Sequence, residues 1–161
     1  MRIVNELKGR EEVVQWFTKS ATEPRGSQGK ALEIKPDYAE AYGNHGNVLQ
    51  KLGRWDEALA SYGRAIKIKP DYALAYFNRG IVLQELRRWD QAIASYDQAI
   101  AIKSDYADAH YNRGVTLQTL KRWEEALASY DRAIAIEPTY AAAFSNRGLT
   151  LQELKREEEA I

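Results

Sequence analysis

Eight carboxamide side chains recur along the chain at a spacing that could hold a polypeptide backbone. They are four asparagines and four glutamines, each set repeating every 34 residues: Asn44, Asn78, Asn112 and Asn146, then Gln50, Gln84, Gln118 and Gln152. A carboxamide carries donors and an acceptor, so one side chain can bond both the N–H and the C=O of one peptide unit. Asparagine is a mediocre helix former, so helix propensity does not explain its recurrence. The pattern predicts a ladder that holds an extended backbone whatever its sequence.

A structural role is the alternative for the asparagines. In that interpretation each one forms a bond inside its own repeating unit, or its recurrence only reflects duplication of the unit. The two interpretations differ in what removal of the side chains does. The first predicts lost binding in a stable protein, and the second predicts lost stability.

The sequence gives little support for a catalytic, metal-binding or cofactor-binding site. There is no cysteine, which excludes disulfides, thiolate metal ligands and thiol nucleophiles. The two histidines, His45 and His110, fall at different places in their units, and we expect each on a helix surface or in packing. The motifs of serine hydrolases, zinc peptidases, dinucleotide-binding folds and P-loops are absent. We therefore expect neither catalytic residues nor a metal or other cofactor.

The composition narrows the class of partner. In 161 residues, 23 lysines and arginines balance 23 aspartates and glutamates, so the charge pattern of a general nucleic-acid binder is missing. Apolar runs are only a few residues long, which disfavours a membrane span. The first residues lack an apolar core of signal-peptide length, so a cytoplasmic location is the default expectation.

The carboxamides belong to a repeat that covers most of the chain. Other residues keep the same period of 34, among them Tyr38, Tyr72, Tyr106 and Tyr140, Gly46, Gly80, Gly114 and Gly148, and Leu49, Leu83, Leu117 and Leu151. Counting from the alanine after each tyrosine gives units at 39–72, 73–106 and 107–140, followed by a truncated unit at 141–161. The second and third units agree at 20 of 34 positions, so the repeat is not accidental.

Each unit is predicted to form two helices, at about 39–52 and 55–68 in the first unit. Expected N-caps of the first helices are Asp37, Asp71, Asp105 and Thr139. Glycine inside a helix costs about 1 kcal/mol relative to alanine. Its recurrence at Gly46 and its equivalents therefore indicates close helix approach, with Ala58 and its equivalents as the expected partners. One helix pair cannot bury its own apolar face, so the units must stack.

Gly46, Ala58, Tyr62, Ala65 and Pro70 resemble the signature of the tetratricopeptide repeat, or TPR. The resemblance covers residues 39–161. The tryptophan usual early in the first helix of a TPR is replaced here by Tyr42, Tyr76, His110 and Phe144. The resemblance implies an all-α fold, a right-handed superhelical solenoid of antiparallel helix pairs whose first helices line a concave groove.

Helical spacing places residues 2, 5, 6, 9, 12 and 13 of each unit on one face of the first helix. The predicted peptide-binding residues on this face are Asn44, Asn78, Asn112, Asn146, Gln50, Gln84, Gln118, Phe77, Tyr111, Ile81 and Val115. The asparagines resemble the ladder of O-linked N-acetylglucosamine transferases and the single asparagine of the chaperone-binding TPR carboxylate clamp. The clamp's lysine and arginine are missing from an apolar to mildly acidic wall. Arg79, Arg113 and Arg147 are predicted to point away from it, with their heads in solvent.

The two ends depart from the pattern. Residues 1–38 are expected to contain an N-terminal helix, a loop and a degenerate partial repeat. The last unit stops partway, so we expect Leu149 and Leu151 to be poorly covered. The chain is accordingly expected to be a fragment of a longer protein, or to pair with another copy through its uncapped end.

Together these features predict a non-enzymatic scaffold that binds an extended peptide of a partner protein. Neither nucleic acid nor a membrane is an expected partner. Two alternatives stay open at this point. One is a segment of a larger enzyme, such as a glycosyltransferase, in which the repeats present substrate. The other is a structural module that self-assembles by stacking its uncapped ends.

Overall fold

The computed structural model describes the backbone of residues 37–159 and the side chains of residues 39–156. This part of the chain contains seven helices and no strand: α2 (Asp37–Lys51), α3 (Trp55–Ile68), α4 (Ala73–Glu85), α5 (Trp89–Ile102), α6 (Ala107–Thr119), α7 (Trp123–Ile136) and α8 (Ala141–Glu159). The N-terminal segment predicted over residues 1–38 lies outside the described residues, apart from its last two. None of the seven helices combines the length and apolarity needed to cross a bilayer.

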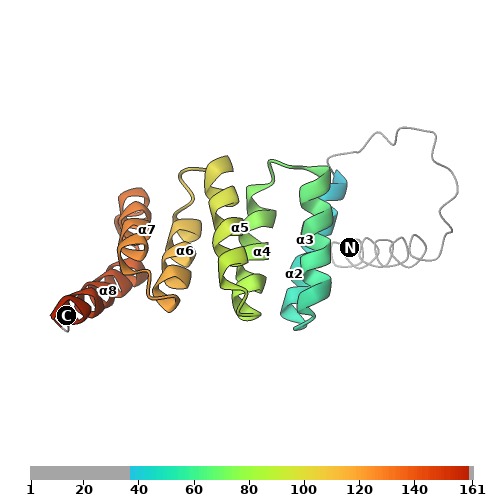
Figure 1. Cartoon of the computed structure of the whole chain (residues 1–161). Helices are drawn as coiled ribbons and strands as arrows, with labels where there is room; N and C mark the ends of the chain where they lie inside the picture. Colours follow the sequence, from blue (N-terminus) through green and yellow to red (C-terminus); the bar gives the residue numbers. More distant parts are fainter. Residues whose placement is uncertain (1–36, 160–161) are drawn as a thin grey trace, which may run out of the picture. The chain divides into compact units, whose positions relative to one another are not determined.

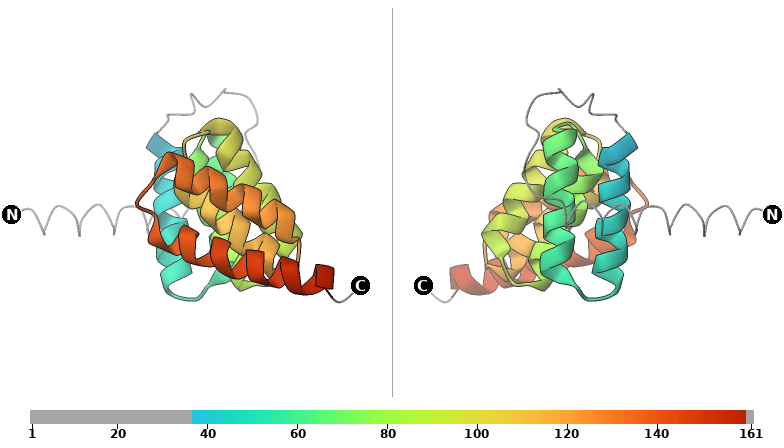
Figure 2. Two further views of the ribbon diagram at one scale, coloured as in Figure 1. Left: turned by 90° about the vertical axis from the view of Figure 1, so that its left-hand side faces the viewer. Right: turned by 90° about the vertical axis from the view of Figure 1, so that its right-hand side faces the viewer.

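Consecutive helices pack as pairs, α2 with α3, α4 with α5 and α6 with α7, and each pair packs on the next (Figure 1). The first helix of each pair also touches the first helix of the next pair. We call α2, α4, α6 and α8 the first-helix layer, and α3, α5 and α7 the second-helix layer (Figure 2). The arrangement is an all-α solenoid of antiparallel helix pairs.

The core of each pair is a tyrosine ring packed on a glycine. Tyr62, Tyr96 and Tyr130 are fully buried. A methyl group on Gly46, Gly80 or Gly114 would come within 2.6, 2.5 or 2.6 Å of a carbon of the tyrosine ring in the same pair. Only glycine therefore fits beneath the ring. The atoms nearest to each glycine belong to the tyrosine ring and not to the alanines that were expected as its partners.

Of the predicted N-caps of the first helices, Asp71 and Asp105 are wrong by one residue. Tyr72 and Tyr106 hold the N-cap positions of α4 and α6 and make no side-chain cap bond. Their backbone oxygens accept the first helical hydrogen bonds, as from the N–H of Ala75 to Tyr72 at 3.0 Å. The Tyr106 ring packs 4.8 Å from the ring of Phe77 in the preceding pair. Packing between pairs therefore sets where the helix begins, ahead of local capping preference.

The turns within the pairs require a left-handed backbone residue. Gly53, Arg87 and Lys121 have φ values of 69°, 55° and 58°. In each turn the next N–H reaches back to a leucine oxygen, as from Arg54 to Leu49 at 2.9 Å, which closes the end of the first helix. Glycine adopts this conformation without strain, whereas arginine and lysine do not. The equivalent residue of the last unit, Lys155, lies inside α8, where no such turn forms.

We predict that Arg87→Gly and Lys121→Gly each raise the free energy of unfolding by about 0.5–1 kcal/mol. A left-handed residue other than glycine costs roughly 1–2 kcal/mol, and the greater chain entropy of glycine offsets only part of that gain. Urea unfolding of the single variants measures the change. Lys155→Gly is the matched control, because glycine within a helix should lower stability or leave it unchanged. A loss of stability at both positive-φ positions would contradict the prediction.

Candidate functional site

Two hydrogen bonds between neighbouring first helices locate the predicted asparagine ladder. Nδ2 of Asn78 on α4 donates to Oδ1 of Asn47 on α2 at 2.8 Å. Nδ2 of Asn146 on α8 donates to the hydroxyl of Tyr111 on α6 at 3.1 Å. Both asparagines therefore lie at seams of the first-helix layer, where one first helix meets the preceding one.

The other two asparagines differ from these. Nδ2 of Asn112 donates to the backbone oxygen of Asp108, one turn earlier in its own helix, at 2.8 Å. Asn44 is exposed, and its side chain makes no hydrogen bond within residues 37–159. In Asn78, Asn112 and Asn146 the amide nitrogen is thus engaged internally, while Oδ1 accepts no hydrogen bond from the described residues. The layer presents these side chains mainly as hydrogen-bond acceptors.

The predicted glutamines brace the buried tyrosines. Oε1 of Gln50, Gln84 and Gln118 accepts a hydrogen bond from the hydroxyl of Tyr62, Tyr96 and Tyr130 at 2.8, 2.6 and 2.6 Å. Burial raises the pKa of these three tyrosines above the usual value, so each hydroxyl keeps its proton and donates. The glutamine oxygens are engaged in these internal hydrogen bonds. Their amide N–H groups are therefore the part of the side chain that could bind a ligand.

The predicted apolar residues form a partly buried wall beside the asparagines. The Phe77 ring lies 6.0 Å from that of Tyr96 and 4.8 Å from that of Tyr106, between centroids. Tyr111 repeats this arrangement in the next pair, 6.0 Å from Tyr130 and 4.9 Å from Tyr140. Ile81 packs against the core cluster that contains Tyr96, and Val115 packs against the core cluster that contains Tyr130. The wall therefore presents aromatic and aliphatic side chains that are held in place by the buried core they pack against.

In the first pair, a glycine and an asparagine replace the aromatic and aliphatic residues of this wall. Gly43 stands where the later pairs have Phe77 and Tyr111, and the ring of Tyr72 occupies the adjacent space, 3.2 Å from where a methyl group on Gly43 would lie. Asn47 stands where the later pairs have Ile81 and Val115. Its Oδ1 accepts hydrogen bonds from both Asn78 and Tyr62. Asn47 was not among the predicted site residues, because it interrupts the repeat instead of following it.

The arginines that follow the ladder asparagines do not have their heads free in solvent, contrary to prediction. Nε of Arg113 pairs with Oδ1 of Asp97 at 2.6 Å, and Nη1 donates to Oγ of Ser129 at 2.7 Å. Nε of Arg147 pairs with Asp131 at 2.5 Å, and Nε of Arg79 donates to Ser95 at 3.0 Å. These heads are bound to the second-helix layer.

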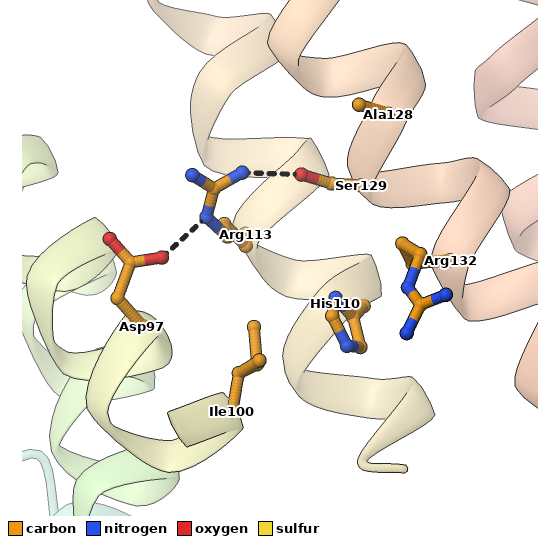
Figure 3. Close-up of a pocket in the computed structure, with 7 residues that line it drawn as sticks. All are labelled: Asp97, Ile100, His110, Arg113, Ala128, Ser129 and Arg132. Carbon is orange, nitrogen blue, oxygen red and sulfur yellow. Dashed lines mark hydrogen bonds and ion pairs between the residues drawn. The ribbon is translucent and has the colours of Figure 1, made fainter. Parts of the chain in front are cut away.

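A hollow of about 210 Å³ lies among α5, α6 and α7 (Figure 3). Its lining residues are Asp97, Ile100, His110, Arg113, Ala128, Ser129 and Arg132. His110 stands where the earlier units have Tyr42 and Tyr76. Its imidazole ring is smaller than a tyrosine side chain, which leaves room for the hollow. Burial lowers the pKa of His110, and this effect together with the charges of Arg132 and Arg113 outweighs the Ser104 oxygen and Asp97, which act to raise it. The imidazole is therefore neutral at pH 7, and its Nε2 lies 3.2 Å from the backbone oxygen of Ser104.

We predict that the free energy of unfolding falls as the pH drops from 7.5 to 5.5. The pKa values of His45 and His110 are both lowered in the folded chain, chiefly by burial. The unfolded chain then binds more protons below its histidine pKa of about 6.5, so acid favours unfolding. His110→Tyr, which restores the residue of the earlier units, should weaken this dependence. Urea unfolding across the pH range measures it, and an unchanged slope in the variant would contradict the prediction.

Comparison of the sequence with protein families gives consistent matches. The TPR repeat family matches residues 46–87 and 85–121, and the tetratricopeptide repeat family matches residues 107–140. No curated protein matches the sequence.

Several solved structures share the fold of this chain. Two of the three described below are TPR domains, and the third is MamA. The first TPR of Spaghetti (RPAP3) bound to HSP90 peptide SRMEEVD has a TM-score of 0.74 and 25% identity, covering 78% of this chain and 99% of that one. The Arabidopsis OM64 TPR domain has a TM-score of 0.71 and 27% identity, with coverage of 73% and 98%. MamA has a TM-score of 0.72 and 25% identity, with coverage of 80% and 75%. With its helix pairs and its repeated tyrosine–glycine core, the chain belongs to the TPR family and forms a protein-interaction module.

Proposed function

We propose that the first-helix layer binds an extended segment of a partner protein, with its asparagines holding the peptide backbone. The observation that carries this proposal is the state of the asparagine side chains. In Asn78, Asn112 and Asn146 the amide nitrogen is fixed by an internal hydrogen bond, which leaves Oδ1 available to accept. An extended peptide carries backbone N–H groups along its length, and these are the donors that such a row of acceptors fits.

The charges of this surface favour an apolar, neutral or basic peptide. Glu40 and Asp108 are exposed acids on the first helices. Arg113 and Arg147 are held by Asp97 and Asp131, so neither is free to receive a carboxylate from a peptide. The RPAP3 domain with the similar fold is bound to the acidic peptide SRMEEVD. We expect this chain to select a different class of peptide, with apolar side chains seated against Phe77 and Tyr111.

The proposed role is non-catalytic. One pair in the described residues resembles a nucleophile and its base, since Nδ1 of His45 lies 2.9 Å from Oγ of Ser61. The same two positions are joined in the next two pairs by Arg79 with Ser95 and by Arg113 with Ser129. A bond that survives replacement of histidine by arginine serves to join the two helices, because arginine cannot act as a general base at neutral pH.

We predict that Asn78→Ala/Asn112→Ala weakens peptide binding about 5- to 150-fold. Two lost hydrogen bonds at roughly 0.5–1.5 kcal/mol each correspond to that range. The probe is a 12-residue peptide selected from a random display library on the wild-type protein, titrated by calorimetry. Arg132→Ala is the control, since Arg132 is exposed on the second-helix layer and should leave the affinity unchanged.

Thermal unfolding of the same variants separates binding from folding. Loss of Asn78 removes one partly buried hydrogen bond, and loss of Asn112 removes one within its own helix, where alanine is the better helix former. The melting temperature should therefore change by only a few degrees. A large fall in melting temperature, with binding lost only in proportion, would support the structural interpretation of the asparagines. Tight binding of SRMEEVD by the wild-type protein would contradict the expected peptide class.

A further inference from the structure

The hollow among α5, α6 and α7 lies beside a position where one unit has exchanged a tyrosine for a smaller ring. His110 occupies this position, whereas the two preceding units have Tyr42 and Tyr76. His110 is only 8% exposed, so its ring keeps its place in the packed interior but fills less of it. The lining of the hollow includes the aliphatic side chains of Ile100 and Ala128. The space therefore suits a ligand that has an apolar, planar part.

In the earlier pairs an arginine lies over the tyrosine ring at this position. Cζ of Arg64 is 5.6 Å from the ring centre of Tyr42, and Cζ of Arg79 is 5.4 Å from that of Tyr76. Arg132 is the repeat equivalent of Arg64 and lines the hollow, but no aromatic ring of residues 39–156 lies beneath it. A guanidinium is attracted to the face of an aromatic ring. The hollow thus has the cation of this contact and lacks the ring.

The charges around the hollow favour an anion. Figure 3 shows the guanidinium of Arg132 beside His110. Arg113 is turned toward α5 and α7 instead, where its Nε pairs with Asp97 and its Nη1 donates to Ser129. The charges of Arg113 and Asp97 therefore offset each other. Arg132 forms no ion pair with any residue that the structure describes, so its positive charge is the one left for a ligand.

His110 has one ring nitrogen available for a ligand. Its Nε2 lies 3.2 Å from the backbone oxygen of Ser104, which can only accept, so Nε2 carries the hydrogen of the neutral ring. Its Nδ1 bonds no residue within 39–156. Burial lowers the pKa of His110, and the charges of Arg132 and Arg113 act in the same direction, against the Ser104 oxygen and Asp97. A bound anion would offset the arginine charges, and a protonated Nδ1 would then donate to it.

We propose that the hollow is a binding site for a small aromatic carboxylate. The ring of the ligand takes the place of the tyrosine ring of the earlier units and packs against Arg132, with apolar contacts to Ile100 and Ala128. Its carboxylate lies between Arg132 and His110. The hollow shares no residue with the asparagine seams, so the inference does not rest on the proposed function.

NMR titration of the whole chain with benzoate, phenol and acetate tests the ligand class. Benzoate has the ring and the carboxylate, whereas phenol lacks the charge and acetate lacks the ring. Benzoate should bind with a Kd of about 0.1–10 mM, as expected for a ligand of its size. Phenol and acetate should each bind at least about fivefold more weakly. The proposal is overturned if benzoate does not bind, or if either of the other two binds as tightly.

Variants at the hollow test the location of the site. His110→Tyr refills the space and should abolish benzoate binding, and it should fold, because tyrosine occupies this position in both preceding units. Arg132→Gln introduces the residue that the second unit has at this position, Gln98, and should weaken binding at least about fivefold. Arg64→Gln is the matched control and should bind like the wild type. Retained binding in His110→Tyr, or equal binding by the two arginine variants, would overturn the proposal.

The dependence of binding on pH tests the contact between the carboxylate and His110. Because the bound anion favours the protonated ring, the affinity for benzoate should rise as the pH falls from 7.5 to 5.5, by at most about tenfold per pH unit for one coupled proton. His45→Gln removes the chain's other histidine and should keep this rise. An affinity that does not change with pH, or a rise that is lost in His45→Gln, would show that the carboxylate does not lie beside His110 and would overturn the proposal.

Discussion

The contact of a tyrosine ring with a bare glycine backbone determines the geometry of each helix pair. The rings of Tyr62, Tyr96 and Tyr130 lie where any side chain on the opposing glycine would have to stand. A larger residue in place of Gly80 would push the two helices apart and break the bond from Tyr96 to Gln84. Packing and hydrogen bonding thus act on the same ring. Because that contact recurs in each complete pair, the first helices are held in equivalent positions and present equivalent faces.

The joints between pairs depend on this fixed position. Aromatic contacts such as Phe77 with Tyr106 and hydrogen bonds such as Asn78 with Asn47 both cross from one pair to the next. Between the two layers, the ion pair of Arg113 on α6 with Asp97 on α5 also crosses from one pair to the next. Exposed ion pairs add little stability, so we attribute most of the joint to the partly buried aromatic rings. The ion pairs have a second effect, since they hold positive charge away from the asparagine seams.

The sequence alone was sufficient for the fold, because a period of 34 with recurrent tyrosine, glycine and alanine leaves few ways to pack. It predicted the bounds of α3 as the structure has them. It failed where the outcome depended on which side chain fills a shared space, as with the ring over Gly46 and the N-cap at Tyr72. It also could not distinguish Gln84 from Asn78. Both recur on one helix face, but only the packed structure shows that the glutamine oxygen is bonded to a buried tyrosine.

Departures from the repeat are where one unit can acquire properties that the others lack. Asn47 replaces an aliphatic residue and Gly43 an aromatic one, so the seam between α2 and α4 is polar. Between α6 and α8, Tyr111 instead packs on Tyr140 and accepts a bond from Asn146. A peptide lying along the first-helix layer would meet a polar end and an aromatic end. In the proposed binding mode, asparagines at the same repeat position would hold the peptide backbone in any register, so the unequal side chains around them would fix its direction and its position.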